Sequence, residues 1–155
     1  MMSPQSRFKD SGETAYCFAD ESLVHCPQCN MKSLVKYLEP TTDTVPRWRF
    51  TCTHCGHNAI RTTRGNVGQP VDPTFGFPLW LACNCCAETL WAYNEKHLEH
   101  IEAFVGATLR ETFFGTDPPS GYANGSLASR YPKWMVIASN RDAILRGCKV
   151  LRAKL

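Results

Sequence analysis

The chain has 155 residues, of which 43% are hydrophobic and 20% are charged, and its formal net charge is +3. These values are typical of a globular protein with one domain or two small ones, and no run of apolar residues is long enough to span a membrane. The first residues include no apolar signal-peptide core. We therefore expect a cytoplasmic protein whose nine cysteines are reduced.

Charge is distributed unevenly along the chain. Residues 30–66 contain six Lys or Arg against two Asp or Glu, and residues 117–155 contain seven against two. Residues 81–112 contain two against five. A polyanion is therefore expected to contact the two basic regions rather than the acidic region between them.

Two C-x-x-C pairs follow a lead-in over residues 1–22: Cys26 with Cys29, and Cys52 with Cys55. Each turn of this kind places two thiolates on one side of a tight loop. Two facing turns give a closed tetrahedral set of four sulfurs, which suits zinc. We expect these cysteines to bind a structural Zn²⁺ ion with no open position for catalysis. The nearby histidines are expected to support the ligands rather than replace them: His25, His54 and His57.

Strands are predicted around both cysteine pairs, because β-branched and aromatic side chains are frequent there. They cover residues 33–38, 45–51 and 58–64. Gly56 follows the second pair, where a positive φ is often needed. This alternation of strand and cysteine turn over residues 23–64 resembles the zinc ribbons of the transcription-factor type. The resemblance implies a three-stranded zinc ribbon, over residues 23–66, that binds DNA, RNA or a polymerase or only holds a fold together.

A turn-rich stretch, residues 65–73, is a candidate boundary between two halves. Beyond it the sequence predicts a β-hairpin with strands at 77–82 and 89–93. A helix from about 95 to 113 should follow, with Asn94 as its N-cap. Residues 76–111 are also similar to a small uncharacterised bacterial family, in which a cysteine pair precedes a Leu-Trp-Ala-Tyr-Asn strand; that resemblance implies no activity.

The C-terminal part reads as a Pro/Gly loop over 115–128, short helices near 127–130 and 133–138, and a last helix near 140–154. The expected fold class is therefore α+β. An N-terminal three-stranded zinc ribbon is followed by a β-hairpin with two or three helices over residues 67–155, and whether the two halves share one core stays open.

A second group of metal-ligand residues lies in the predicted hairpin and helix. Cys83 and Cys86 repeat the C-x-x-C spacing, and His97 and His100 are three residues apart on the helix. The combination resembles a ββα zinc finger with a shortened gap. The alternatives are a second zinc site, a hairpin of reduced cysteines packed on the helix, and a catalytic Cys–His pair. We do not expect an enzyme, because the sequence contains none of the phosphate-loop, zinc-protease or serine-elbow motifs.

Basic side chains form the candidate surface for nucleic acid. In the strand around Trp48, alternation places Arg47 and Arg49 on one face and the aromatic residues on the other. The full set of candidate contacts is Arg47, Arg49, Arg61, Arg64, Arg141, Lys149 and Arg152. We expect a zinc-binding protein that contacts DNA or RNA. The alternative is a protein-interaction adaptor that uses the acidic helix and the aromatic hairpin, with the ribbon as a structural staple.

Overall fold

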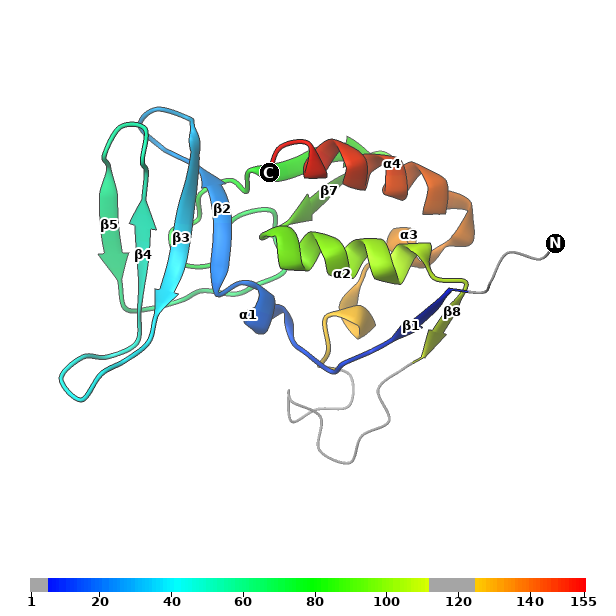
Figure 1. Cartoon of the computed structure of the whole chain (residues 1–155), viewed down its shortest axis with the longest axis horizontal. Helices are drawn as coiled ribbons and strands as arrows, with labels where there is room; N and C mark the ends of the chain where they lie inside the picture. The colour runs from blue at the N-terminus through cyan, green and yellow to red at the C-terminus, as the bar shows by residue number, and fades with distance from the viewer. Residues whose placement is uncertain (1–5, 112–124) are drawn as a thin grey trace.

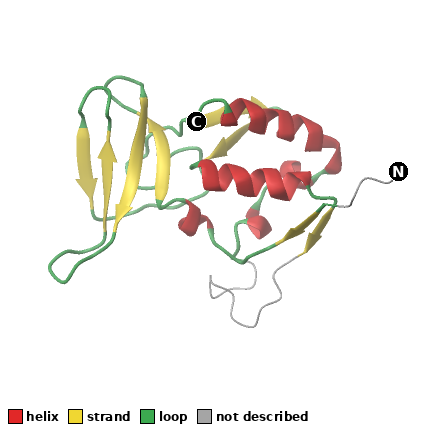
Figure 2. Cartoon of the chain, in the orientation of Figure 1, coloured by secondary structure: helices red, strands yellow, loops and turns green. Residues whose placement is uncertain are grey.

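A computed structural model describes residues 6–111 and 125–155 and shows an α+β fold (Figures 1 and 2). A four-stranded sheet stands beside a body of helices and short strands. The elements in chain order are β1 (Arg7–Lys9), α1 (Ala15–Phe18), β2 (Glu21–His25), β3 (Lys32–Leu38), β4 (Arg47–Thr51), β5 (Asn58–Arg61), β6 (Leu81–Cys85), β7 (Glu88–Ala92), α2 (Glu95–Gly106), β8 (Leu109–Glu111), the 3-10 helix η1 (Ala128–Arg130), α3 (Lys133–Val136), η2 (Ala138–Asn140) and α4 (Arg141–Arg152). Most of the predicted Pro/Gly loop lies outside the described residues.

The sheet is antiparallel, in the order β2-β3-β4-β5. Its strands alternate, so that Trp48 and Phe50 on β4 are buried while Arg49 between them is exposed. Val35 on β3 lies directly opposite Phe50 and is also buried. The sequence predicts three strands here, and the structure has four, because β2 precedes the first cysteine turn and pairs along its whole length with β3.

Strand β2 also joins the sheet to the second half of the chain. The Leu23 N–H donates to the Tyr93 carbonyl at 2.8 Å. The Trp80 N–H donates to the Leu23 carbonyl, and the His25 N–H to the Pro78 carbonyl, both at 2.9 Å. The buried cluster beneath the sheet accordingly includes side chains from both halves, among them Val24, Phe50, Leu79, Tyr93 and Leu127.

The stretch predicted as a boundary, residues 65–73, leads into a loop that is held by hydrogen bonds to Asp72. Asp72 is 1% exposed, and its carboxylate accepts hydrogen bonds from the backbone N–H groups of Thr74, Phe75 and Phe77 at 2.7–3.0 Å. An aspartate that accepts local N–H groups in this way stabilises a turn. The loop therefore places residues 77–80 against β2.

The second half has its own hydrophobic cluster, formed by the β6–β7 hairpin, α2 and α4. Apolar residues at helical spacing predict a stripe on each helix, and most of each stripe is buried: Leu98, Ile101 and Val105 on α2, and Ile144, Cys148 and Leu151 on α4. The last residue expected in each stripe, Leu109 and Leu155, is exposed beyond the end of its helix. Asn94 caps α2 as predicted, since its Oδ1 accepts the His97 N–H at 2.9 Å. No helix in the described ranges is long and apolar enough to cross a membrane.

Helix α2 ends at Gly106, earlier than predicted, because the chain becomes extended at Ala107 and forms β8. Strand β8 pairs in parallel with β1, which lies in the supposed lead-in and buries Phe8. Arg141 on α4 donates from its guanidinium to the carbonyls of Val105 and Ala107. This cation satisfies the last carbonyls of α2, as expected at a helix C-terminus.

Gly147 on α4 gives a test of this packing. A Cβ built there would lie 2.8 Å from the Leu90 Cδ2 atom and 3.7 Å from each of the Cys83 and Cys85 sulfurs. We expect Gly147→Ala to lower the free energy of unfolding by about 1 kcal/mol, because the overpacking cost exceeds the gain in helix propensity. Gly106→Ala is the control, since its new Cβ would meet only the Leu145 side chain at 3.9 Å. Urea unfolding of both variants should separate them; equal stability would contradict this account.

Candidate metal centre

The two N-terminal cysteine pairs lie in the turns of neighbouring hairpins. Cys26 and Cys29 lie between β2 and β3, and Cys52 and Cys55 lie between β4 and β5. Figure 1 shows both turns at the same end of the sheet. Because β3 and β4 are direct neighbours, the sheet brings two turns that are far apart in sequence to face each other.

Both turns have the same backbone construction. The Asn30 N–H donates to the Cys26 carbonyl at 2.9 Å, and the Gly56 N–H donates to the Cys52 carbonyl at 3.0 Å. Asn30 and Gly56 each follow the second cysteine of a pair, and their φ angles are 62° and 81°. Asparagine and glycine are the residues that adopt this left-handed conformation most readily. Sequence reasoning identified Gly56 and missed Asn30, although the shared position was the available signal.

The four sulfurs form one compact group. All four Sγ atoms lie within 4.8 Å of one another. The Cys26 and Cys55 sulfurs are 3.6 Å apart, and the Cys29 and Cys52 sulfurs are 3.5 Å apart. Four sulfurs at about 2.3 Å from a central ion would be about 3.8 Å apart. The group therefore has the size of a tetrahedral thiolate site that could hold a metal ion.

The surroundings of the cluster favour thiolates at Cys52. Hydrogen bonds from the Ser33 hydroxyl and then from the Cys55 N–H, at 3.5 Å, lower the pKa of the Cys52 thiol to about 5. The effect is opposite at Cys29: although the Met31 backbone lowers its pKa, burial and the neighbouring cysteines raise it to about 12. The Gln28 N–H approaches the Cys26 sulfur at 3.4 Å in the same way. N–H groups that point at sulfur stabilise the charged form that binds metal. All nine cysteines of the chain are free of disulfide bonds.

The neighbouring histidines lie outside the four-sulfur group. His25 contacts the Asn30 carbonyl through Nδ1 at 3.4 Å, and its ring lies 4.7 Å from the Trp80 ring. The His57 ring packs 5.4 Å from Phe50, and His54 is exposed. The cluster of potential ligands contains cysteines alone.

The second predicted metal site is not assembled. Among the described residues, the four-cysteine group is the one cluster of three or more potential ligands, so Cys83, Cys86, His97 and His100 do not come together. Cys86 is exposed at the hairpin tip with φ 55°, whereas His97 is buried with Nδ1 accepting the Tyr93 N–H at 3.1 Å. His100 contacts the Tyr131 hydroxyl at 2.6 Å. The two histidines pack against aromatic rings, His97 on Tyr93 and His100 on Tyr131, whereas Cys86 lies at the exposed hairpin tip.

Two thiols of this hairpin, Cys83 and Cys85, have raised rather than lowered pKa values. Burial raises the pKa of Cys83 and raises that of Cys85 to about 11. Both face α4, where each sulfur would lie 3.7 Å from a Cβ at Gly147. A reactive cysteine requires a lowered pKa, so these two side chains have the character of core residues.

The candidate nucleic-acid contacts are scattered, and several have partners within the chain. Arg64 pairs with Asp20 at 3.0 Å and lies over the Tyr16 and Trp48 rings. Arg152 pairs with Glu102 and Glu95 of α2. Arg61 lies over the Phe75 ring and donates to a carbonyl, and Arg141 donates to the end of α2. Arg49 and Lys149 are exposed, whereas Arg47 is half-buried.

Comparisons of the chain with family models, with curated proteins and with solved structures find no match. Both family resemblances therefore stay predictions, and the candidate centre rests on its own geometry.

Gly56 allows the backbone requirement of the metal-site turn to be measured. We expect Gly56→Val to lower the free energy of unfolding by roughly 1–2 kcal/mol, because a β-branched residue is strained at positive φ. Gly56→Asn should cost less, since asparagine tolerates this conformation. A Cβ at Gly56 meets nothing within 4 Å, so the first side-chain atom does not clash in either variant. If both variants unfold at the same urea concentration, the φ requirement is wrong.

Proposed function

We propose that this chain is a zinc-binding protein in which Cys26, Cys29, Cys52 and Cys55 hold one structural Zn²⁺ ion. The single observation that supports this most strongly is the convergence of four sulfurs within 4.8 Å on two hairpin turns. Four thiolate ligands fill the tetrahedron, so the ion stabilises the fold and has no open position for a substrate. In this proposal the sheet with its two cysteine turns is a zinc ribbon extended by strand β2.

The outer part of the sheet should depend on the metal most. Strand β5 buries none of its side chains fully, and Ala59 alone is half-buried. Strand β2, in contrast, is hydrogen-bonded to the second half of the chain through Leu23 and His25. Because folding and metal binding are coupled in such sites, removal of the ion should release β5 before β2.

Metal analysis tests the zinc proposal. The purified chain should contain one zinc per molecule, because a single cluster of ligands is present in the described structure. Cys52→Ser should abolish stoichiometric zinc, whereas the matched Cys86→Ser variant should keep it. Two zinc ions per chain, loss of zinc from the Cys86 variant, or the visible absorbance of an iron–thiolate centre would each contradict the proposal.

Hydrogen exchange during chelation provides the matching structural measurement. Exchange should accelerate in β5 and in both cysteine turns, and change least in α2 and α4. Uniform acceleration through the whole chain would show that the ion supports one cooperative unit instead.

A second candidate function is nucleic-acid binding on the exposed face of the sheet. The register places Lys36 directly opposite Arg49, and both side chains are exposed. Glu21 on β2 lies opposite Lys36 on its other side, but neither Lys36 nor Arg49 forms an ion pair with another described residue. Like charges across a strand pair repel each other, so an external anion would be favourable at this position. Phosphate groups of DNA or RNA would supply that anion. Arg47 lies on the same face of β4 at its start.

Salt-dependent binding tests this candidate. The chain should bind a mixed-sequence oligonucleotide at low salt, and the Lys36→Ala/Arg49→Ala double variant should bind about tenfold more weakly at 50 mM salt with a shallower salt dependence. A double variant of exposed cations elsewhere, Lys133→Ala/Arg146→Ala, is the control. Binding that is absent at low salt, or equal in both variants, would exclude this face as the contact.

A further inference from the structure

A large cavity lies away from the metal centre and is lined mainly by the second half of the chain. Its volume is about 960 Å³. Its apolar walls come from β7, α2 and the segment around η1 and α3, and include Leu90, Trp91, Ile101, Leu127, Tyr131 and Met135. Pockets of this size with mainly apolar and aromatic walls are typical of small-molecule sites.

One buried polar group on the cavity wall has no partner. His97 lines the cavity and is 1% exposed. Its Nδ1 accepts the Tyr93 N–H at 3.1 Å, so the proton of the neutral ring is on Nε2. That Nε2 atom is buried and forms no hydrogen bond. Buried donors in native proteins are almost always paired, so this one is available to a ligand.

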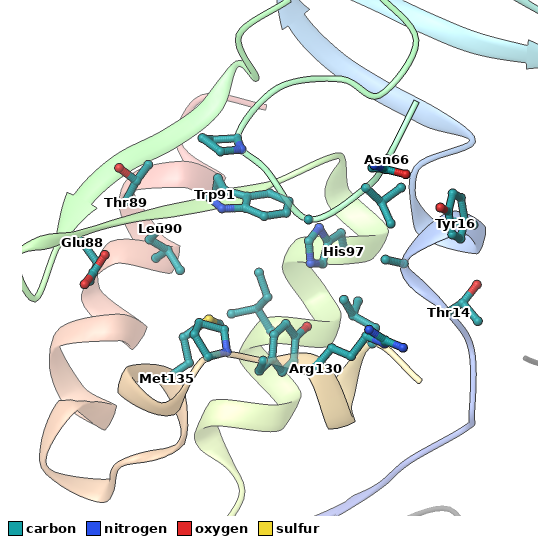
Figure 3. A pocket seen from close by; sticks show the side chains of 18 of the residues that line it. Thr14, Tyr16, Asn66, Glu88, Thr89, Leu90, Trp91, His97, Arg130 and Met135 are labelled. Carbon is teal, nitrogen blue, oxygen red and sulfur yellow. The ribbon is translucent and has the colours of Figure 1, made fainter. Parts of the chain in front are cut away.

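The His97 ring is held as a neutral donor. Burial lowers its pKa to about 3, and the nearby His100 adds to the effect. Its ring is stacked on Tyr93 at 5.2 Å and meets Trp91 edge-on at 5.6 Å. Figure 3 shows Trp91 and His97 on one side of the cavity and Met135 on the other. A flat ring system that enters between them would therefore meet aromatic surfaces and one N–H group.

The rim of the cavity includes a cation without a partner. Arg130 at the end of η1 lines the cavity and is exposed, and it forms no ion pair with any described residue. Figure 3 shows its side chain on the Met135 side of the cavity. Glu88 lies at the far end of the lining in that view. An anionic group on a ligand would therefore be oriented toward Arg130 and away from Glu88.

We propose that this cavity binds a small aromatic anion. Its ring system occupies the space beside Trp91 and Ile101, an acceptor atom on the ring accepts a hydrogen bond from the His97 Nε2–H, and its negative charge lies near Arg130. Because the Nε2 edge is covered in the structure described here, binding includes a small movement of the lining side chains. This site is independent of the zinc proposal, since it uses none of the four cysteines.

A pair of dyes with similar ring systems tests the proposal on the full-length chain. The probes are 8-anilinonaphthalene-1-sulfonate, which is an aromatic anion, and the uncharged N-phenyl-1-naphthylamine. We expect the anion to bind saturably with one site per chain. Val67→Trp, which fills the cavity from its loop side, should weaken binding at least about tenfold. Arg130→Ala should weaken binding of the anion by about threefold and leave the neutral dye unchanged.

Arg146→Ala is the matched control, because Arg146 is an exposed arginine on α4 that does not line the cavity. The His97 ring is followed in the wild-type chain by ¹⁵N-edited NMR, so the test does not depend on a core variant that fails to fold. Saturation with the anion should shift the Nε2–H signal of His97. Binding without a fixed stoichiometry, unchanged binding in Val67→Trp, or an unmoved His97 signal at saturation would each overturn the proposal.

Discussion

Tyr93 is the residue at which the parts of this structure meet. Its carbonyl accepts the Leu23 N–H from β2, its N–H donates to His97 on α2, and its hydroxyl accepts the Gly68 N–H from the loop between the halves. The side chain is fully buried in the cluster beneath the sheet. Three polar groups and a ring therefore tie the sheet, the helix and the connecting loop to one position. Because a buried polar group that loses its partner is costly, none of these elements can shift alone.

Two different kinds of stabilisation operate on the two sides of this junction. Near Tyr93 the sheet is supported by burial, since Val24, Val35 and Phe50 are at most 2% exposed. Farther out, β5 pairs with β4 along its whole length but has little apolar surface to bury, and the second cysteine turn connects the two strands. An ion held by both turns would replace the missing hydrophobic contacts at that end, which is the usual role of metals in small domains. The hydrophobic core and such an ion would thus stabilise different strands.

The sequence was most informative where one local rule decides the structure. The C-x-x-C spacing predicted the four-sulfur group, and the apolar periodicity predicted the buried stripes of α2 and α4. It was less informative where long-range contacts decide. The pairing of β1 with β8 accompanies the early end of α2. No local sequence signal near Gly106 indicates that the next residues pair with a strand about a hundred residues earlier in the chain. Likewise, the spacing of His97 and His100 matched a metal site, but packing against Tyr93 and Tyr131 determined their surroundings.

The unpartnered nitrogen of His97 follows from the same junction. Tyr93 directly follows the last residue of β7, so its N–H needs an acceptor outside the strand. That acceptor is Nδ1 of His97 in the first turn of α2. Accepting this bond fixes the tautomer, because a neutral imidazole with Nδ1 as acceptor must have its proton on Nε2. The backbone N–H of Tyr93 is thus paired, and the donor that stays unpaired is the Nε2–H of His97 on the cavity wall. A ligand that accepts from Nε2 would complete a chain of hydrogen bonds that runs from the cavity, through His97 and Tyr93, to strand β2 of the sheet.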